Sequence, residues 1–290
     1  MSNIKVNLKE SDEKWSIVIK PKNNIFNLNF RELFEYKDLL FMFIKRDFVT
    51  YYKQTILGPL WFLLQPIIST IVFTVIFGNI AKIPTDGIPQ VLFYMAGIVS
   101  WNYFSGCLTT NSSTLIANAS IFGKVYFPRL IIPVSVIISN FIKFFIQFFL
   151  FLLFALYFYL KGASIKPNLW VLFTPFLLLQ MGLISLGFGL FISSLTIKYR
   201  DLNFLVTFGV QLWMYATPIV YPMSQIPDKY KILILLNPMS SLVEIFRYSF
   251  LGAGTLNLNY FLISLLVTVV VLIVGILMFN RVEKTFVDMV

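Results

Sequence analysis

The chain has 290 residues, of which 58% are apolar and only 12% are charged, and its mean hydropathy is +0.81. A soluble domain carries roughly 25% charged residues, so this composition excludes an ordinary soluble protein and indicates an integral membrane protein. Histidine is absent and Cys107 is the single cysteine. An internal disulfide is therefore excluded, and a metal site built from histidine or cysteine is not expected.

The first 58 residues differ in kind from the rest of the chain. Residues 1–30 are polar and charged and predict a cytoplasmic tail, with a short strand at 15–19. In residues 31–58, apolar side chains recur at helical spacing while charged side chains favour the other faces. This pattern predicts an amphipathic helix that lies along the cytoplasmic surface of the membrane.

Residues 59–290 hold the long apolar runs. A helix needs about 20 apolar residues to cross a bilayer. Six runs reach this length, and they predict membrane spans at about 60–80, 91–116, 130–160, 169–195, 202–221 and 260–279. The expected fold class is an all-α, polytopic membrane protein with six transmembrane helices, preceded by the amphipathic interfacial helix.

A further apolar segment, 232–251, does not fit a simple span. Asn237-Pro238 interrupts it, and Glu244 and Arg247 follow. Non-helical or charged backbone at membrane depth is tolerated only where protein shields it or where it lines a watery cavity. The segment therefore predicts a re-entrant helical hairpin on the outer face, between the fifth and sixth spans.

The distribution of cations predicts the orientation. With six spans and an inside N-terminus, the inside segments carry 16 of the 23 Lys and Arg residues and the outside segments carry 6, while Lys143 lies within a span. Cytoplasmic loops carry an excess of Lys and Arg. We therefore expect a multi-pass membrane protein with both termini in the cytoplasm.

Motifs for energy-yielding chemistry are missing from the sequence. It has no G-x-x-x-x-G-K-[ST] phosphate loop and no G-x-S-x-G nucleophile elbow. No row of carboxylates in the spans suggests a proton relay. These absences predict a transport subunit with no catalytic residues, no metal and no cofactor of its own, which draws energy from a partner.

Five short motifs follow one another along the chain. They are Arg46-Asp47 with Tyr52-Lys53 and Trp61, then Lys124-Val-Tyr-Phe-Pro-Arg129, Tyr199-Arg-Asp201, Thr217-Pro-Ile-Val-Tyr-Pro222, and Asn237-Pro238 with Arg247. Taken together, they resemble the permease subunits of type-2 ABC exporters. The closest subgroup exports lipid-linked polysaccharides such as O-antigen, capsule or teichoic acid chains, and the resemblance leans towards the O-antigen branch.

The resemblance implies an assembly of two permeases and two ABC ATPase subunits that bind ATP and Mg²⁺. It also implies a coupling helix between spans two and three that fits into the ATPase, here at about 118–129. The residues it assigns to this contact are Asn118, Lys124, Val125, Tyr126, Phe127, Pro128 and Arg129. Aromatic residues and Arg are favoured at interface centres, although a membrane-surface loop with two snorkelling cations would show the same residues.

Two further regions are assigned to the path of the substrate. The interface helix would help to form a cytoplasmic entrance, with Arg46, Asp47, Tyr52 and Lys53 contacting the partner or a lipid headgroup; an ordinary membrane anchor is the alternative. A sliding sugar chain needs many weak contacts to aromatic rings. The channel-lining candidates are Trp61, Tyr94, Trp101, Tyr103, Phe104, Trp213 and Tyr215, although aromatic residues in spans also face lipid or form interfacial belts.

The remaining candidates are charged or polar residues at membrane depth. Asn237, Pro238, Glu244 and Arg247 are assigned to an outside gate, while a simple ion pair between Glu244 and Arg247 is the alternative. Lys143 departs from the family, which more often places an acidic residue near this point. Snorkelling, a salt bridge across the permease pair and substrate contact remain open for it.

The function expected from the sequence is the permease of an ATP-driven exporter that moves a lipid-linked polysaccharide, most plausibly O-antigen, across the inner membrane. Its partners are a second copy of the chain, two ATPase subunits, the substrate and the membrane, with no nucleic acid. Two alternatives are a type-2 ABC permease for a drug or small lipid, and a membrane-embedded glycosyltransferase. The last would need a carboxylate cluster at a membrane face, which the short loops do not supply.

Overall fold

The computed structural model describes residues 34–53, 55–122, 124–125 and 127–289, and these form helices joined by turns and loops. The predicted all-α class is confirmed. The helices are α2 (Lys37–Tyr52), η1 (Gly58–Leu60), α3 (Trp61–Phe73), the π-helix η2 (Thr74–Ile80), α4 (Gln90–Ser112), α5 (Thr114–Ala117), α6 (Ala119–Phe122), α7 (Ile131–Leu160), η3 (Leu169–Phe173), α8 (Thr174–Thr196), α9 (Leu202–Ala216), η4 (Met223–Gln225), α10 (Asp228–Leu236), α11 (Pro238–Leu251) and α12 (Leu258–Met289).

Among the described residues, five helical segments are long and apolar enough to cross a membrane. They are Gly58–Ile80, Gln90–Ser112, Ile131–Leu160, Leu169–Thr196 and Leu258–Val282. The sequence predicted a sixth at 202–221, but α9 has 15 residues and ends at Ala216. At about 1.5 Å per residue it is some 22 Å long, less than the roughly 30 Å of a hydrocarbon core. The count of six spans therefore stays a prediction.

The early end of α9 has a local cause. Thr217 precedes Pro218 and has an extended backbone, with ψ of 142°. The ring of a proline disfavours the helical conformation in the residue before it, so the helix stops there. The chain then crosses a short loop to η4 and α10 instead of completing the predicted span.

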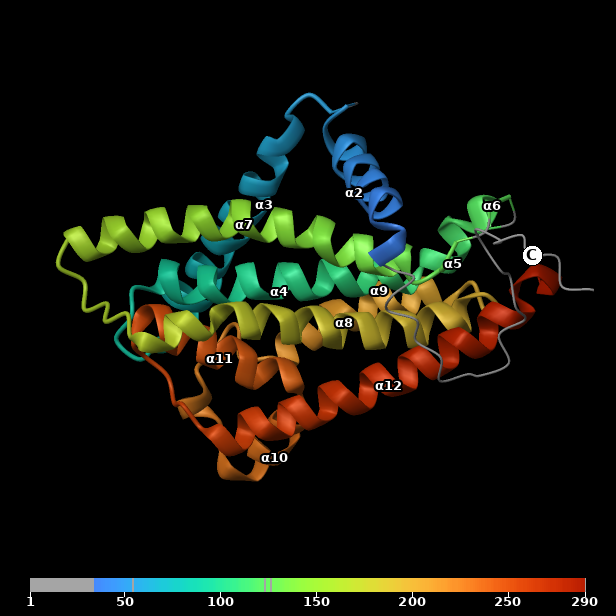
Figure 1. The fold of residues 1–290 in the computed structure, drawn as a ribbon. Helices are drawn as coiled ribbons and strands as arrows, with labels where there is room; N and C mark the ends of the chain where they lie inside the picture. Colours follow the sequence, from blue (N-terminus) through green and yellow to red (C-terminus); the bar gives the residue numbers. More distant parts are fainter. Residues whose placement is uncertain (1–33, 54, 123, 126, 290) are drawn as a thin grey trace, which may run out of the picture.

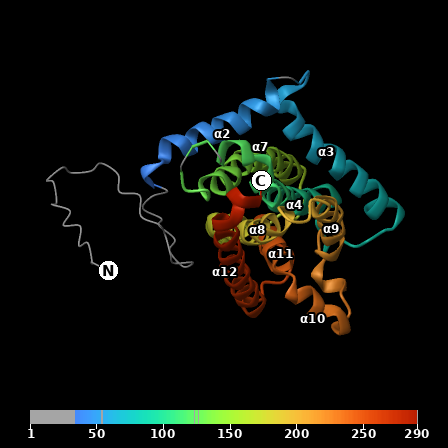
Figure 2. The same ribbon diagram turned by 90° about the vertical axis from the view of Figure 1, so that its right-hand side faces the viewer.

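The helices α4 and α8 lie in the centre of the bundle. In the end-on view, α7, α3, α9, α11 and α12 surround them (Figure 2). Most of α4 is buried: every residue from Leu92 to Trp101 is covered, while Thr110 near its end is exposed. Phenylalanines fill the space between α7 and α11. They are Phe144, Phe148, Phe151, Phe246 and Phe250, with neighbouring ring centroids 4.9–6.4 Å apart.

Glycines allow α8 and α12 to pack closely along their length. A Cβ atom added at Gly187 would lie 2.8 Å from the Leu272 backbone, and one added at Gly275 would collide with the Gly187 carbonyl. The amide nitrogen of Gln180 on α8 donates to the hydroxyls of Ser264 and Thr268 on α12, at 3.0 and 3.3 Å. Small residues and interhelical hydrogen bonds are the usual means of association in lipid, where apolar surface alone gives little driving force.

The helices α2 and α3 form an inverted V over α7 (Figure 1). The described part of the predicted amphipathic segment is the helix α2, which packs against α7. Phe43 and Ile44 are buried there, while Phe41 and Met42 are exposed. The expectations for residues 1–30, including the strand at 15–19, lie outside the described residues.

Candidate functional sites

The side chain of Arg247 on α11 joins three separate parts of the chain. It is 1% exposed, and its guanidinium donates to the carbonyls of Pro218 and Ile219 at 2.5 and 2.6 Å and to the Phe93 carbonyl at 3.3 Å. The same group lies 3.7 Å from the centroid of the Phe93 ring. Arg247 therefore fixes the loop after α9 against both α4 and α11, so two of the five sequence motifs belong to one structural unit.

Glu244 completes this unit. One of its carboxylate oxygens lies 3.9 Å from Arg247, and the other accepts a hydrogen bond of 3.2 Å from the Thr255 backbone amide. Gly254 allows the approach, because a Cβ atom there would lie 2.8 Å from the carboxylate and the backbone has a positive φ of 115°. A buried carboxylate needs such partners. The linker between α11 and α12 is thereby tied to Arg247.

Asn237 forms a second polar junction at the start of α11. Its side-chain oxygen accepts from the Met239 amide and from Trp213 Nε1, at 3.1 and 3.0 Å. Its side-chain nitrogen donates to Thr217 Oγ1 at 2.9 Å. Asn237 is thus both the N-cap of α11 and the link from α11 to the end of α9, which explains why this residue precedes Pro238 at the first helical position.

The four residues assigned to an outside gate lie at or in α11, and Asn237 and Arg247 hold the adjacent residues Thr217 and Pro218. The segment 232–251 comprises the end of α10 and the whole of α11, with Asn237 between them, and its re-entrant path and its role as a gate stay predictions. The partners Phe93, Thr217 and Thr255 were not predicted. Thr217 and Pro218 stand in one of the five motifs, but no sequence pattern indicated that Arg247 would bind the carbonyls of Pro218 and Ile219.

A polar groove of about 390 Å³ lies between α2, the end of α4 and α7. Arg46 and Lys143 both line it, together with Asp47, Thr50, Thr110, Ser113, Thr114, Asn118, Ser139 and Asn140. Arg46 donates to Asn118 at 3.2 Å and pairs with Asp47 at 2.8 Å, while Lys143 donates to Asn140 at 3.2 Å. Ser139 is 3% exposed and its hydroxyl has no hydrogen-bond partner among the described residues. Arg46, predicted to lie at a cytoplasmic entrance, and Lys143, predicted to be an isolated cation within a span, thus line the same groove.

Other entrance candidates are less well defined. Lys53 is exposed at the end of α2. The backbone of Tyr52 belongs to the last turn of α2, and its side chain lies outside the described part of the structure.

The segment assigned to ATPase coupling lies at the end of the bundle that also holds the C-terminus (Figure 1). Within 118–129 the chain forms the four-residue α6 and then turns. Lys124 and Val125 are exposed, and Arg129 stacks over the Phe122 ring at 5.5 Å. Phe127 is buried between Phe122 and Phe43 of α2, with ring centroids 5.6 and 5.8 Å away. Tyr126 lies outside the described residues.

The channel-lining candidates separate into buried and exposed groups. Tyr94, Trp101, Tyr103 and Phe104 on α4 are at most 4% exposed and pack within the chain. Trp101 and Phe104 contact Trp213, whose indole nitrogen is engaged by Asn237. Trp61 and Tyr215 are 50% and 51% exposed. Of the seven candidates, these two are the ones that the described part of the chain leaves about half exposed.

The fold defines a helical membrane protein, with five helical segments long and apolar enough to cross a membrane and no cluster of three or more metal-ligating residues among those described. Residues 38–251 match the family model described as "ABC-2 type transporter". The chain belongs to the ABC-2 type transporter family.

Similar proteins extend over most of the chain. An O-antigen export system permease protein, RfbA, from Klebsiella pneumoniae is 29% identical over 252 residues, which cover 87% of this chain and 94% of the relative. RfbA from Myxococcus xanthus is 28% identical over 76% of this chain and 83% of its own. The polysialic acid transport protein KpsM from Escherichia coli is 24% identical over 82% and 91%.

Proposed function

We propose that this chain is the permease subunit of an ATP-driven exporter that moves a lipid-linked polysaccharide, most plausibly O-antigen, across the bacterial inner membrane. Relatives with the names of O-antigen and polysialic acid transporters support the substrate class, since they match the chain over most of both lengths. The structural observation that carries the proposal is the polar groove shared by Arg46 and Lys143.

The groove has the chemistry to receive the phosphate end of a carrier lipid. Arg46 and Lys143 supply two cations, and hydroxyl and amide groups supply further donors. Asp47 neutralises part of this charge through its contact with Arg46. Phosphate oxygens are strong acceptors for such groups, and cations at a membrane surface attract anionic headgroups. In this proposal Lys143 contacts the substrate.

Energy would enter through the segment 118–129. The sequence has no phosphate loop, so ATP and Mg²⁺ would bind in two separate ABC ATPase subunits. Exposed Lys124 and Val125 are available for their surface, while buried Phe127 anchors the segment to α2. A push on this segment would therefore reach the helix that borders the groove. Both termini would be cytoplasmic, on the same side as these contacts.

A second copy of the chain would complete the pathway. In α9 only Val210 is buried, and the exposed residues include both large apolar side chains and the polar Gln211. A polar side chain facing lipid is costly, so this face suits contact with a partner or with a hydrated path. Trp61 on α3 and Tyr215 on α9 would then be the aromatic residues that meet the sugar chain.

The test is an export assay in a strain that lacks the gene for this chain. We expect the lipid-linked polysaccharide to accumulate inside and to disappear from the cell surface, and the wild-type gene to restore it. The double variant Arg46→Gln, Lys143→Gln should fail to restore export while still assembling with the ATPase. A matched variant, Lys161→Gln, Lys166→Gln, removes two exposed cations from other loops and should export normally. Normal surface polysaccharide in the deletion strain would refute the proposal.

A further inference from the structure

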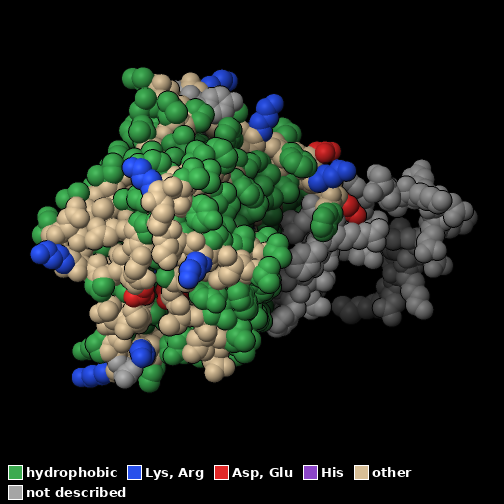
Figure 3. Space-filling view, turned by 90° about the vertical axis from the view of Figure 1, so that its left-hand side faces the viewer, with side chains coloured by type: hydrophobic (Ala, Val, Ile, Leu, Met, Phe, Trp, Pro, Cys, Tyr) green, Lys and Arg blue, Asp and Glu red, His purple; other side chains and the backbone are tan. Residues whose placement is uncertain are grey.

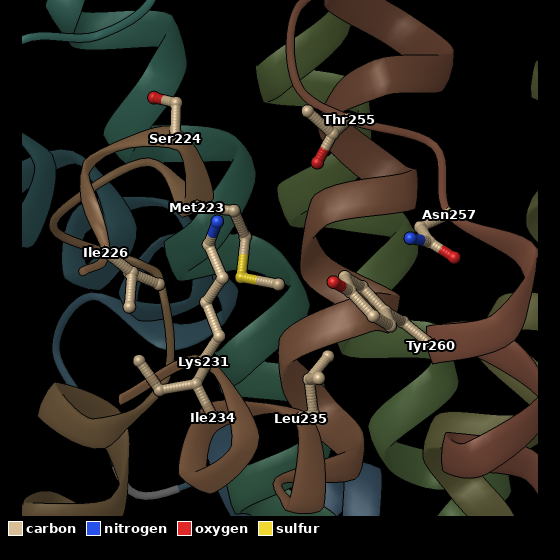
Figure 4. Close-up of a pocket in the computed structure, with 9 residues that line it drawn as sticks. All are labelled: Met223, Ser224, Ile226, Lys231, Ile234, Leu235, Thr255, Asn257 and Tyr260. Carbon is tan, nitrogen blue, oxygen red and sulfur yellow. The ribbon is translucent and has the colours of Figure 1, made fainter. Parts of the chain in front are cut away.

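A second cavity, of about 220 Å³, lies beside the start of α12, between the segment η4–α10 and the linker that follows α11 (Figure 4). This end of the bundle is opposite the end that holds α5, α6 and the C-terminus (Figure 1). The face viewed from that side mixes apolar and uncharged polar surface, with a few cations (Figure 3). The functions described above leave the cavity unassigned.

Polar groups point into the cavity from two sides. Lys231 comes from α10, while Thr255, Asn257 and Tyr260 come from the linker and the first turn of α12. The hydroxyls of Thr255 and Tyr260 are directed towards the space between the two sides, and the Lys231 side chain extends along the opposite side so that its amine lies beside Met223 (Figure 4). Three chain segments thus place four polar side chains around a single small cavity.

The orientation of the Asn257 amide follows from a local hydrogen bond. Its side-chain oxygen accepts from the Asn259 backbone amide at 3.0 Å. The side-chain nitrogen is therefore left on the side that faces the cavity, as Figure 4 shows. Ser224 behaves in the opposite way, because its hydroxyl donates to Asp86 at 2.9 Å and is directed away from the cavity. The inward groups are rich in hydrogen-bond donors.

Apolar side chains form the remaining wall. Met223 and Ile226 are each 8% exposed, and Ile234 and Leu235 of α10 lie beside them. The Tyr260 ring adds an aromatic surface. Rings of this kind combine a large apolar face with a polar tip. A sugar ring has the complementary chemistry, with a C–H face that packs on aromatic and aliphatic groups and hydroxyl oxygens that accept hydrogen bonds.

We propose that this cavity binds one sugar residue of the exported polysaccharide on the outer side of the membrane. The proposal rests on the proposed function and extends it to a subsite for the emerging chain. Pockets for drug-sized ligands have volumes of roughly 300–1,000 Å³, so this smaller cavity suits a single sugar residue. A sugar residue bound here would keep the emerging polysaccharide from sliding back while the cytoplasmic end of the pathway returns to its starting conformation.

The cavity is also connected to the buried polar unit around Arg247. The Thr255 backbone amide donates to Glu244, and Glu244 lies 3.9 Å from Arg247, which holds the loop before η4. Both walls of the cavity are therefore anchored to the same side chain. This anchoring keeps the two walls at a fixed separation. A binding site for a small polar ligand needs such fixed positions of its polar groups.

The experiment uses the permease purified with its ATPase partner in lipid nanodiscs. The probe is an oligosaccharide released by mild acid from the surface polysaccharide of the same cells, and saturation-transfer NMR and calorimetry measure its binding. The double variant Lys231→Ala, Tyr260→Ala should weaken binding at least tenfold. The matched control Lys229→Ala, Tyr230→Ala removes the same two residue types from exposed positions of α10 outside the cavity, and it should bind like the wild type.

Three results would overturn the inference. The wild-type complex could show no saturable binding, or the cavity variant and its control could bind equally. Short-chain phosphatidylglycerol could displace the probe fully at equal concentration, which would make the cavity a lipid-headgroup site instead. The export assay in the deletion strain tests the proposed function separately from the sugar subsite. If export requires this chain but the cavity variant binds the oligosaccharide as the wild type does, the subsite is refuted while the proposed function stands.

Discussion

Arg247 on α11 lies over the ring of Phe93 on α4, with the guanidinium carbon 3.7 Å from the ring centroid, although 154 residues separate the two in the chain. The contact is buried, and the same guanidinium binds the carbonyls that follow Thr217. A planar donor group with five N–H bonds can serve a ring face and several carbonyls at once. This one side chain therefore joins α11 to α4 and to the loop after α9.

Replacing Arg247 with Leu should therefore destabilise the protein strongly. The Pro218 and Ile219 carbonyls would lose their donors, and Glu244 would remain buried without its cation. Breaking a buried pair in this way costs about 3–5 kcal/mol. Thermal unfolding in detergent, followed by tryptophan fluorescence, would measure the loss. Arg281→Leu, at an exposed position of α12, is the control and should leave the midpoint almost unchanged. Equal midpoints for the two variants would contradict the assigned role.

Asn237→Ala should loosen the joint between α9 and α11. The change removes the N-cap of α11, worth about 1 kcal/mol, and leaves Trp213 Nε1 and Thr217 without their partners. We expect a lower unfolding midpoint together with a shifted Trp213 emission maximum. Asn259→Ala, at an exposed site near the start of α12, should change neither. A variant with the wild-type emission spectrum would show that the indole is not held by Asn237.

Adding one methyl group between α8 and α12 should be costly. Gly187→Ala places a Cβ atom against the Leu272 backbone, which cannot move as a flexible side chain could. Overpacking of this kind costs typically 1–3 kcal/mol. Gly209→Ala on α9 is the matched control, because a Cβ atom there meets nothing within 4 Å. Comparing the unfolding midpoints of the two variants would separate the effect of close helix packing from that of helix propensity. If Gly209→Ala were destabilised as much as Gly187→Ala, close packing between α8 and α12 would not be the cause.

Reversing the charges at the proposed coupling segment should uncouple the subunits. Lys124→Glu with Arg129→Glu should prevent copurification with the ATPase and abolish export, since interface centres depend on a few anchoring residues. The Lys124→Glu substitution should change the stability of the isolated permease little, because Lys124 is exposed. Lys161→Glu with Lys166→Glu, two reversals at exposed positions between α7 and α8, should assemble normally. Retained assembly and export in the double variant would remove the segment 118–129 from the coupling role.

The class of fold could be predicted from the sequence because hydrophobic length depends on local composition alone. The run predicted at 130–160 is the helix Ile131–Leu160, and the run at 169–195 corresponds to η3 and α8. The end of α9 was placed five residues too late, since Thr217-Pro218-Ile219 is apolar enough to extend a run. Hydropathy does not register the conformational effect of a proline on the residue before it.

The candidate sites were predicted as residue types but not as contacts. Lys143 was noticed because a cation within an apolar run is unusual, yet nothing in the sequence placed it in one groove with Arg46, some 97 positions earlier. Aromatic residues on α4 were grouped with Trp61 and Tyr215 by chemistry alone. Their burial depends on which faces of α4 meet α8 and α7. The polar residues Asn102, Ser105 and Thr109 recur at helical spacing on α4 and are among its partly exposed positions, so the sequence carried a signal for the uncovered face that was not used.

The helix α9 leaves all but one of its residues at least partly uncovered by the rest of the chain. A lone copy in the bilayer would thus expose Gln211 to lipid and would hold a helix shorter than the hydrocarbon core, and both features are unfavourable there. We expect unpaired copies to be degraded quickly and paired copies to persist. The amount of this subunit in the cell would then follow the supply of its partners rather than its own rate of synthesis.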